Sequence, residues 1–205
     1  MSKKQINAWL GKEIFEYGNK EKKAQVGCVT GLAYTEFGGD VLQIEVSSYE
    51  GKGGIVMTGK LGDVMKESAE IALDYVKSNA KKFGIDVKFF ETHDIHIHVP
   101  EGAVPKDGPS AGVTLTTAFV SALTNKAVDA NCAMTGEVTL RGNVLPIGGL
   151  REKSIAANRS GITKVFIPKG NVKDIDELPD IVKENITFMP VDKVDTILKE
   201  AIIHD

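Results

Sequence analysis

The chain has 205 residues, of which 42% are hydrophobic and 26% charged, and its formal net charge is −3 at pH 7. This composition is typical of a soluble globular protein, and the length suits one domain with a sizeable core or two small ones. The acidic balance does not indicate a nucleic-acid partner. Two cysteines are poor material for a disulfide framework, and no apolar run resembles a membrane span or a signal peptide, so we expect a cytoplasmic protein with no membrane partner.

The hydrophobic pattern predicts a peripheral segment, residues 1–24, followed by one domain, residues 25–205. Alternating apolar residues in 41–49, after a glycine-rich turn at 38–40, predict a hairpin with 25–36. Apolar residues three and four apart predict a long helix over 62–83. The later elements, in chain order, are expected as strands at 54–58 and 94–99, a helix from 109 to about 125, a strand pair within 132–145, a helix at 149–159, a strand at 164–167, a short helix at 171–176, a strand at 186–191 and a helix from 192. Strands that come first and then mix with helices indicate an α+β fold (mixed α/β).

Ser110 lies where a loop enters a predicted helix, in the sequence KDGPSAG. Pro109 suits the first turn of that helix, because the N–H that proline lacks would be unpaired there anyway. The Ser110 hydroxyl is therefore expected beside unpaired backbone N–H groups and the positive end of the helix dipole. Such a place can hold a nucleophile together with an oxyanion hole. No histidine accompanies this serine in a recognisable triad pattern.

Lys153 is a candidate partner for Ser110, because a neutral lysine can take a proton from a serine hydroxyl. It shares one face of its predicted helix with Leu150 and Ala157, so the spacing permits an inward-facing lysine whose pKa is lowered by burial. The same spacing suits a lysine that snorkels from the edge of the stripe, and spacing alone favours that interpretation, since buried lysines are rare. Lys106 is a rival base, but water would keep it charged on its polar loop.

His96 and His98 lie on one face of a predicted strand. Two such histidines could bind zinc with Asp94 or Glu101 as a third ligand, which would make the protein a zinc hydrolase. No HExxH motif or cysteine pair supports this hypothesis. A histidine acting on Ser110 is a second possibility. The plainer interpretation is a polar strand face packed near the Ser110 loop or at a subunit contact.

Residues 54–60 match the phosphate-loop pattern G-x-x-x-x-G-K. The next residue, Leu61, stands where a phosphate loop needs the Ser or Thr that holds magnesium. The residues between the glycines favour a strand rather than a flexible loop. We therefore predict a strand here and no ATP site.

Blocks of sequence along the chain resemble, in the same order, the proteolytic domain of the Lon protease family. The blocks are residues 29–35, 94–103, 105–112, 134–142 and 145–153, and the similarity extends over roughly residues 25–203. The resemblance implies a Lon-type α+β fold and a serine endopeptidase of an ATP-dependent protease that degrades unfolded or misfolded proteins as a hexameric ring. Ser110 matches the nucleophile of that family and Lys153 its general base.

Two supporting residues follow from the same comparison. Thr135 matches a family threonine whose hydroxyl lies near the catalytic lysine, which it can orient in either protonation state. Asp107 could pair with Lys153, which would keep the lysine charged in a resting site, or it could serve as a turn or helix cap. The sequence leaves both roles of Asp107 open.

The resemblance also implies an ATPase module, which does not fit in 205 residues. We therefore expect the proteolytic domain alone, with residues 1–24 as its junction to that module. No cofactor is expected in this chain, and ATP and Mg²⁺ are expected only for the ATPase module. The alternative is a non-catalytic oligomerisation or docking module of the same fold, although the intact Ser110 and Lys153 argue against it.

Overall fold

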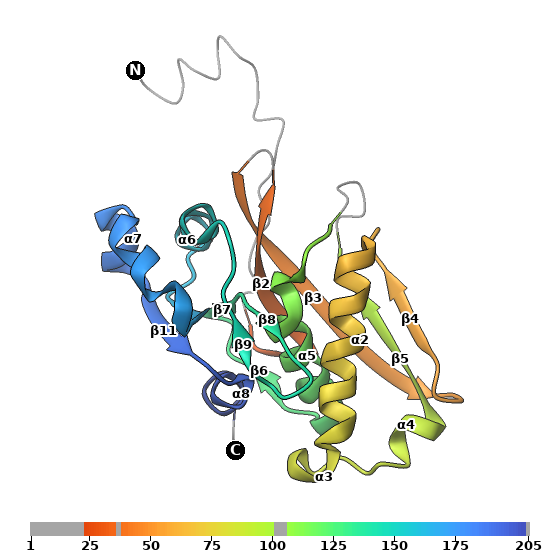
Figure 1. Cartoon of the computed structure of the whole chain (residues 1–205). Coiled ribbons are helices and arrows are strands. Elements are labelled where there is room, and N and C mark those ends of the chain that lie inside the picture. The colour runs from red at the N-terminus through yellow and green to blue at the C-terminus, as the bar shows by residue number, and fades with distance from the viewer. Residues whose placement is uncertain (1–22, 36–37, 101–105, 204–205) are drawn as a thin grey trace.

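A computed structural model describes residues 23–35, 38–100 and 106–203 (Figure 1). Within them, a mixed sheet of seven strands has the order β11-β10-β7-β2-β3-β5-β4. Its strands are β2 (Cys28–Thr35), β3 (Gly38–Glu50), β4 (Ile55–Thr58), β5 (His93–His98), β7 (Cys132–Met134), β10 (Lys164–Pro168) and β11 (Thr187–Val191). β3 is antiparallel to both β2 and β5, whereas β7, β10 and β11 continue the sheet in parallel from β2. The predicted α+β fold is confirmed; the expected junction falls largely on residues 1–22, outside the described residues.

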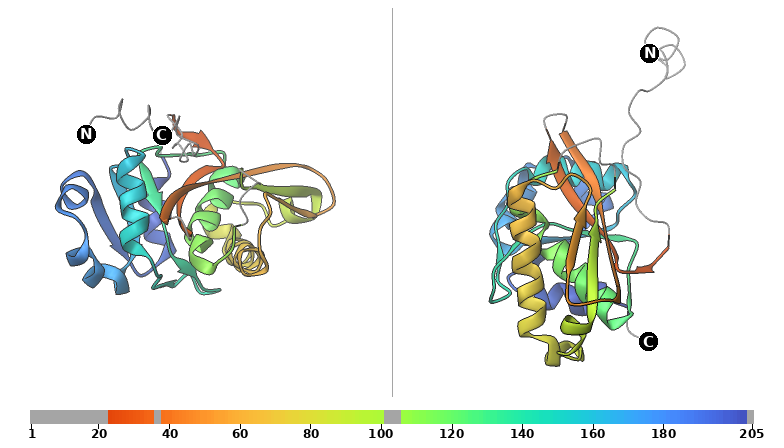
Figure 2. Two further views of the ribbon diagram at one scale, coloured as in Figure 1. Left: turned by 90° about the horizontal axis from the view of Figure 1, so that it is seen from above. Right: turned by 90° about the vertical axis from the view of Figure 1, so that its right-hand side faces the viewer.

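Helices cover both faces of the sheet (Figures 1 and 2). One face carries α2 (Asp63–Ser78), α5 (Gly112–Thr124) and α8 (Val194–Ala201), and the other carries α6 (Leu150–Arg159) and α7 (Asp180–Asn185). Strand β10 shows why, because its side chains alternate between the two faces. Phe166 packs with the first group of helices, while Val165 and Ile167 pack with the second. The described residues therefore form two hydrophobic cores, one on each side of the sheet.

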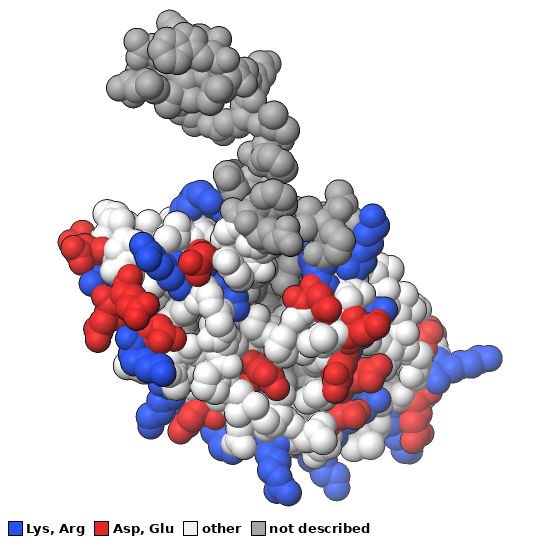
Figure 3. Space-filling view, turned by 45° about the horizontal axis from the view of Figure 1, so that its top comes forward, with Lys and Arg blue, Asp and Glu red and all other residues white. Residues whose placement is uncertain are grey.

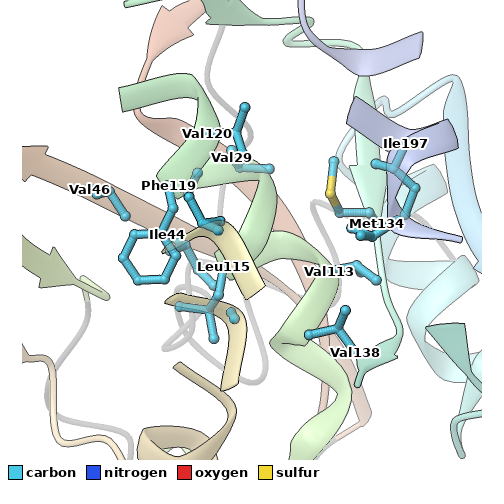
Figure 4. Close-up of a cluster of buried hydrophobic side chains, with 14 of the residues drawn as sticks. Val29, Ile44, Val46, Val113, Leu115, Phe119, Val120, Met134, Val138 and Ile197 are labelled. Atoms are coloured by element: carbon cyan, nitrogen blue, oxygen red, sulfur yellow. The ribbon is translucent and has the colours of Figure 1, made fainter. Parts of the chain in front are cut away.

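Helix α5 runs through the middle of the larger core (Figure 4). Leu115 and Phe119 are fully buried, and so are Thr114, Thr116 and Thr117 of the same helix. Thr116 and Thr117 donate their hydroxyl hydrogens to the carbonyl oxygens four residues earlier, at 2.9 and 2.8 Å. These bonds satisfy polar groups that would otherwise be costly to bury. The turn that leads into α5, where Ser110 lies, is thus attached to a closely packed helix.

Most predicted elements are present, with differences that have local causes. Gly38 and Gly39 belong to β3 rather than to a turn, since Thr35 pairs directly with Gly38. The predicted long helix is interrupted at Asn79, whose side-chain amide donates to the Tyr75 carbonyl at 2.8 Å. The remaining elements are β1 (Gln25–Val26), α3 (Ala80–Phe83), α4 (Phe89–Thr92), the 3₁₀ turn η1 (Pro109–Ala111), β6 (Ala127–Val128), β8 (Glu137–Val138), β9 (Val144–Leu145) and the 3₁₀ segment η2 (Lys169–Glu177).

The sheet opens between β2 and β7, and this opening places the site. The two strands pair only between Gly31 and Met134, after which both continue without pairing to each other. The strands are parallel, so their carboxyl ends lie at the same edge of the sheet, a frequent location for ligand sites. The first turn leading into α5 and the first turns of α6, which come from opposite faces, meet at this edge. Residues 134–136 lie between them.

The surface shows charges of both signs. On the face in Figure 3, Lys and Arg are interspersed with Asp and Glu, so the atoms coloured there do not form a uniformly basic stripe of the kind that follows a nucleic-acid backbone. No helix in the described part of the chain has both the length and the apolar character needed to cross a membrane.

Candidate active site

Ser110 lies in η1, one residue after Pro109, and its side chain is half-buried. Gly108 precedes the turn with φ 122° and ψ 157°, a conformation that side-chain-bearing residues rarely adopt. The carbonyl of Ser110 accepts a hydrogen bond from the N–H of Gly136 at 2.8 Å. The serine is therefore held on both sides, by a glycine-dependent turn before it and by the segment that follows β7.

Lys153 reaches Ser110 from the other face of the sheet. Its side chain is 3% exposed, and Nζ lies 2.9 Å from Ser110 Oγ and 3.1 Å from Thr135 Oγ1. Spacing alone favoured a snorkelling lysine, and that interpretation is wrong. The structure brings together Ser110, Lys153 and Thr135, three of the four residues that the sequence comparison had grouped.

The surroundings of Lys153 favour its neutral form. Burial lowers the pKa of Lys153 from 10.5 to about 8, because the charged ammonium loses water and gains no compensating charge. Among the described residues, no carboxylate lies within ion-pair distance of its Nζ. The two hydroxyls that it contacts can donate to a neutral amine or accept from an ammonium. The site can therefore hold the lysine in either state and permits proton exchange with Ser110.

Asp107 caps helix α2 and does not pair with Lys153. Its Oδ1 accepts from the backbone N–H of Met65 at 3.0 Å and of Gly108 at 2.9 Å. The N-cap residue of α2 is Gly62, which has no side chain to serve this purpose. A Cβ on Gly62 would lie 2.3 Å from Asp107 Cγ, so glycine makes room for the carboxylate. Of the two roles left open by the sequence, the cap is the one observed, and it ties the Ser110 loop to α2.

Replacing Asp107 by alanine should lower the free energy of unfolding by about 1 kcal/mol, the usual cost of losing a helix cap. Asp107→Asn keeps an oxygen acceptor and should lose less than half of that amount. Urea denaturation of the two variants and the wild type measures the difference. Equal stability of all three proteins would contradict the capping role.

The other candidates from the sequence lie elsewhere. The backbone of Lys106 is hydrogen-bonded to the backbone of Lys60 and Gly62. Of the two candidate bases, Lys153 is the one at hydrogen-bond distance from Ser110. His96 Nε2 and His98 Nδ1 both contact Thr58 Oγ1, at 2.9 and 2.7 Å. In the described part of the chain, no cluster of three or more His, Cys, Asp or Glu residues could hold a metal ion. Glu101, one of the proposed third ligands, lies outside the described residues.

Asp94, the other proposed zinc ligand, binds backbone instead. Its Oδ1 accepts from the N–H groups of Lys52 and Gly54 at 2.9 and 2.7 Å, and these bonds lower the pKa of the carboxyl group. The phosphate-loop look-alike at 54–60 is strand β4 followed by a turn, as predicted. Asp94, His96 and His98 therefore contact backbone N–H groups and the Thr58 hydroxyl in this part of the sheet.

A cleft of about 850 Å³ opens onto Ser110 and Lys153. One wall is the end of β2, residues 32–35, on the side where this strand has no pairing with β7. A second wall is the loop of residues 146–149 that leads into α6, and residues 106–111 also line the cleft. Leu32 and Val41 are buried at its base, and Tyr34 is exposed beside it. Residues 32–34 of β2 do not pair with β7 on this side, and an extended peptide chain can join such a strand edge.

Two residues that support the site escaped the sequence analysis. Gly39 lies against the first turn of α6, where a Cβ would stand 1.9 Å from the Glu152 carbonyl oxygen. Asn171, in η2, binds both backbone groups of Ile147 in the cleft wall. The glycine pair at 38–39 was a usable signal for a close backbone approach, although it also suited a turn. Nothing in the local sequence singles out Asn171.

Comparison with known proteins agrees with this geometry. The family model for the Lon protease (S16) C-terminal proteolytic domain matches residues 1–204. The chain belongs to the Lon protease family. It is 63% identical over 189 residues to the Lon protease of Mycoplasma mycoides subsp. mycoides SC, covering 92% of this chain and 24% of that protein. It is 55% identical over 203 residues to Lon protease 1 of Bacillus subtilis, covering 99% of this chain and 26% of that protein.

A more distant relative, Lon protease 1 of Myxococcus xanthus, is 53% identical over 203 residues, which is 99% of this chain and 25% of that protein. The chain thus spans about a quarter of the length of these curated relatives. Membership of the family makes the chain a serine-type proteolytic domain and disfavours the alternative of a non-catalytic module.

Proposed function

We propose that this chain hydrolyses peptide bonds in unfolded or misfolded proteins, with Ser110 as the nucleophile and Lys153 as the general base. The observation that carries the proposal is the 2.9 Å contact between Ser110 Oγ and the Nζ of a buried lysine. With a pKa of about 8, roughly a tenth of Lys153 is neutral at pH 7. At the ordinary pKa of 10.5, only about 0.03% would be neutral, so burial makes a usable base.

In the first half of the reaction, neutral Lys153 takes the hydroxyl proton as Ser110 Oγ attacks the substrate carbonyl carbon. The tetrahedral intermediate collapses when the Lys153 ammonium donates that proton to the amide nitrogen, and the C–N bond of the substrate breaks. This leaves an acyl ester on Ser110 and neutral Lys153. In the second half, Lys153 removes a proton from water as the water oxygen attacks the ester carbonyl carbon. The bond between that carbon and Ser110 Oγ then breaks while the ammonium of Lys153 protonates Ser110 Oγ, and the carboxylic acid product leaves.

Backbone N–H groups at the start of the helix would stabilise the oxyanion. The N–H groups of Ser110 and Ala111 belong to the first turn, where no intrahelical acceptor exists, and the dipole favours negative charge there. Pro109 has no N–H to contribute. The substrate would lie extended along residues 32–34 of β2, on the side that does not pair with β7, and Thr135 would keep Lys153 oriented throughout.

For the whole protein, we propose ATP-dependent proteolysis by a hexameric ring in the cytoplasm. The support is the match to proteins named Lon protease, of which this chain spans about a quarter. ATP and Mg²⁺ would act in an ATPase module, and this chain itself would need no cofactor. Without an unfoldase, the chain should cleave short peptides and unfolded proteins slowly and leave tightly folded proteins intact.

The proposal predicts a pH-dependent peptidase. With a fluorogenic peptide, kcat/KM should rise with pH and level off above an apparent pKa of about 8, because only neutral Lys153 accepts the serine proton. Ser110→Ala should lose activity at every pH while remaining folded. A rate independent of pH between 6 and 9, or a Ser110→Ala variant as active as the wild type, would contradict the Ser–Lys pair.

A further inference from the structure

The loop of residues 146–149 forms a wall of the cleft with little secondary structure of its own. It follows the two-residue strand β9 and ends at Gly149, whose φ of 69° begins helix α6. Gly148 is exposed and Ile147 is half-buried. Such a loop needs an external partner to hold its backbone in one place, because short irregular segments carry few contacts of their own.

Asn171 is that partner. Its side chain is 3% exposed, its Oδ1 accepts from the Ile147 N–H at 3.0 Å, and its Nδ2 donates to the Ile147 carbonyl at 2.8 Å. The amide thus takes both backbone groups of Ile147, as a neighbouring strand would. The second Nδ2 hydrogen goes to Asp174 Oδ2 at 2.7 Å. The two bonds to Ile147 by themselves set the orientation of the amide, and the bond to Asp174 uses the remaining Nδ2 hydrogen.

The segment that carries Asn171 is itself well supported. η2 directly follows β10, and β10 is an inner strand of the sheet. The neighbouring Gly170 lies so close to the loop that a Cβ there would stand 2.6 Å from Pro146 Cγ. Helix α6, by contrast, is anchored by its own buried residues Leu150 and Ala157. The contacts of Asn171 therefore hold the cleft wall in place rather than Lys153.

We propose that Asn171 is a positioning residue for peptide cleavage, which holds the loop of residues 146–149 as the wall against which an extended substrate lies. This inference rests on the proposed function. Because the Ile147 N–H donates to Asn171, this donor is not available to the substrate. The substrate backbone then pairs with β2 and also meets a fixed surface of Ile147 and Gly148, which line the same cleft.

The test compares Asn171→Leu with Asp174→Ala in the 205-residue chain. Leucine has a similar size but no polar atoms, so both backbone groups of Ile147 lose their partner, whereas Asp174→Ala leaves both bonds in place. For an extended fluorogenic peptide, Asn171→Leu should raise KM about tenfold with kcat changed less than twofold, equivalent to about 1.4 kcal/mol of binding. The affinity for a peptide boronate should fall by the same factor. Asp174→Ala should stay within twofold of the wild type in every measurement.

A small alkyl fluorophosphonate separates positioning from general damage, because it reacts with Ser110 without filling the cleft. Its labelling rate should remain within twofold in Asn171→Leu. Unchanged KM and boronate affinity in this variant would overturn the inference, and so would a loss of labelling in proportion to cleavage, which indicates a merely structural role. If Asn171→Leu does not fold, Asn171→Asp replaces it, since the aspartate keeps the acceptor for the Ile147 N–H and sets an oxygen against the Ile147 carbonyl. It should show the same rise in KM, and failure of both variants to fold would also overturn the inference.

The wild-type chain distinguishes this inference from the function on which it rests. A wild type that neither cleaves the peptide nor reacts with the fluorophosphonate would refute the proposed function, and the inference with it. A wild type that does both, beside an Asn171→Leu variant with unchanged KM, would refute the role of Asn171 alone.

Discussion

Replacing Lys153 by methionine should abolish peptide cleavage and at the same time make the protein more stable at pH 7. Methionine has a similar length but cannot take the Ser110 proton, so kcat/KM should fall by about 10³ or more. The side chain is buried, and an apolar group at this position avoids the cost of a buried ammonium. The measurements are peptide cleavage and urea denaturation at pH 7. Retention of more than a tenth of the wild-type rate would contradict the role of Lys153.

The sign of the stability change follows from the lowered pKa of Lys153. Below pH 8 the lysine is protonated in both states, and the folded state bears the full cost of its burial. Between pH 8 and 10.5 the folded state releases its proton first, so the cost is relieved as the pH rises. The lowering of the Lys153 pKa from 10.5 to about 8 corresponds to a loss of folding stability of about 3 kcal/mol at most. Methionine avoids this cost, but it also loses the two hydroxyl contacts of Lys153, which offsets part of the gain.

Lys153→Met should therefore gain on the order of 1–2 kcal/mol at pH 7, and this gain should shrink at pH 10, where the wild-type lysine is largely neutral. Ser110→Ala is the control, because it removes activity without removing the buried amine. A loss of stability in Lys153→Met at pH 7, with no dependence on pH, would show that burial of the lysine is not a cost.

Local patterns in the sequence were enough to predict most elements, because each pattern has a local physical cause. Gly84 ends α3 in the left-handed conformation that glycine favours, and Pro109 begins the turn that carries Ser110. The first turn is 3₁₀ rather than α-helical, and the predicted helix over 62–83 breaks at Asn79. Both differences depend on side-chain and backbone contacts within a few residues, which periodicity of apolar residues does not register.

The geometry of the site depended on contacts between distant segments. Leu150, Lys153 and Ala157 form a stripe that suits either a buried or a snorkelling lysine, and only the packing of α6 against β2 and β3 decides between them. The roles of Asp107 were likewise undecided, because its partner Met65 lies 42 residues away. The resemblance grouped Ser110, Lys153 and Thr135, but it carried no information on the support from Gly39 and Asn171.

Gly39→Ala is expected to have the second-largest effect, because Gly39 lies directly under the turn that carries Lys153. A Cβ at this position would stand 1.9 Å from the Glu152 carbonyl oxygen and 2.9 Å from the Lys153 backbone nitrogen. Both are backbone atoms and cannot move aside like a flexible side chain. Arg159 adds to the contact, since its guanidinium donates to the Gly39 carbonyl at 3.1 Å. The strand and the helix must therefore separate to admit a methyl group.

We expect Gly39→Ala to lose about 2–3 kcal/mol of stability, as overpacked sites do, and at least about 100-fold in kcat/KM, because displacement of a catalytic group by about 1 Å has that effect. Ser154→Ala is the matched control on the same helix. The Ser154 hydroxyl is fully buried and has no hydrogen-bond partner among the described residues, so its removal should leave stability unchanged or slightly higher.

The pH profile of the residual activity tells displacement of Lys153 from partial unfolding. If α6 moves away from β3, water reaches the lysine, its pKa returns toward the ordinary 10.5, and the apparent pKa of kcat/KM rises above 8. If the variant merely unfolds in part, the molecules that remain folded keep the wild-type profile at a lower amplitude. An unshifted profile in a fully folded, slow Gly39→Ala variant would contradict the link between this backbone contact and the buried state of Lys153. An upward shift of the apparent pKa would show that Gly39 helps to set the pKa of Lys153 through a contact between backbones alone.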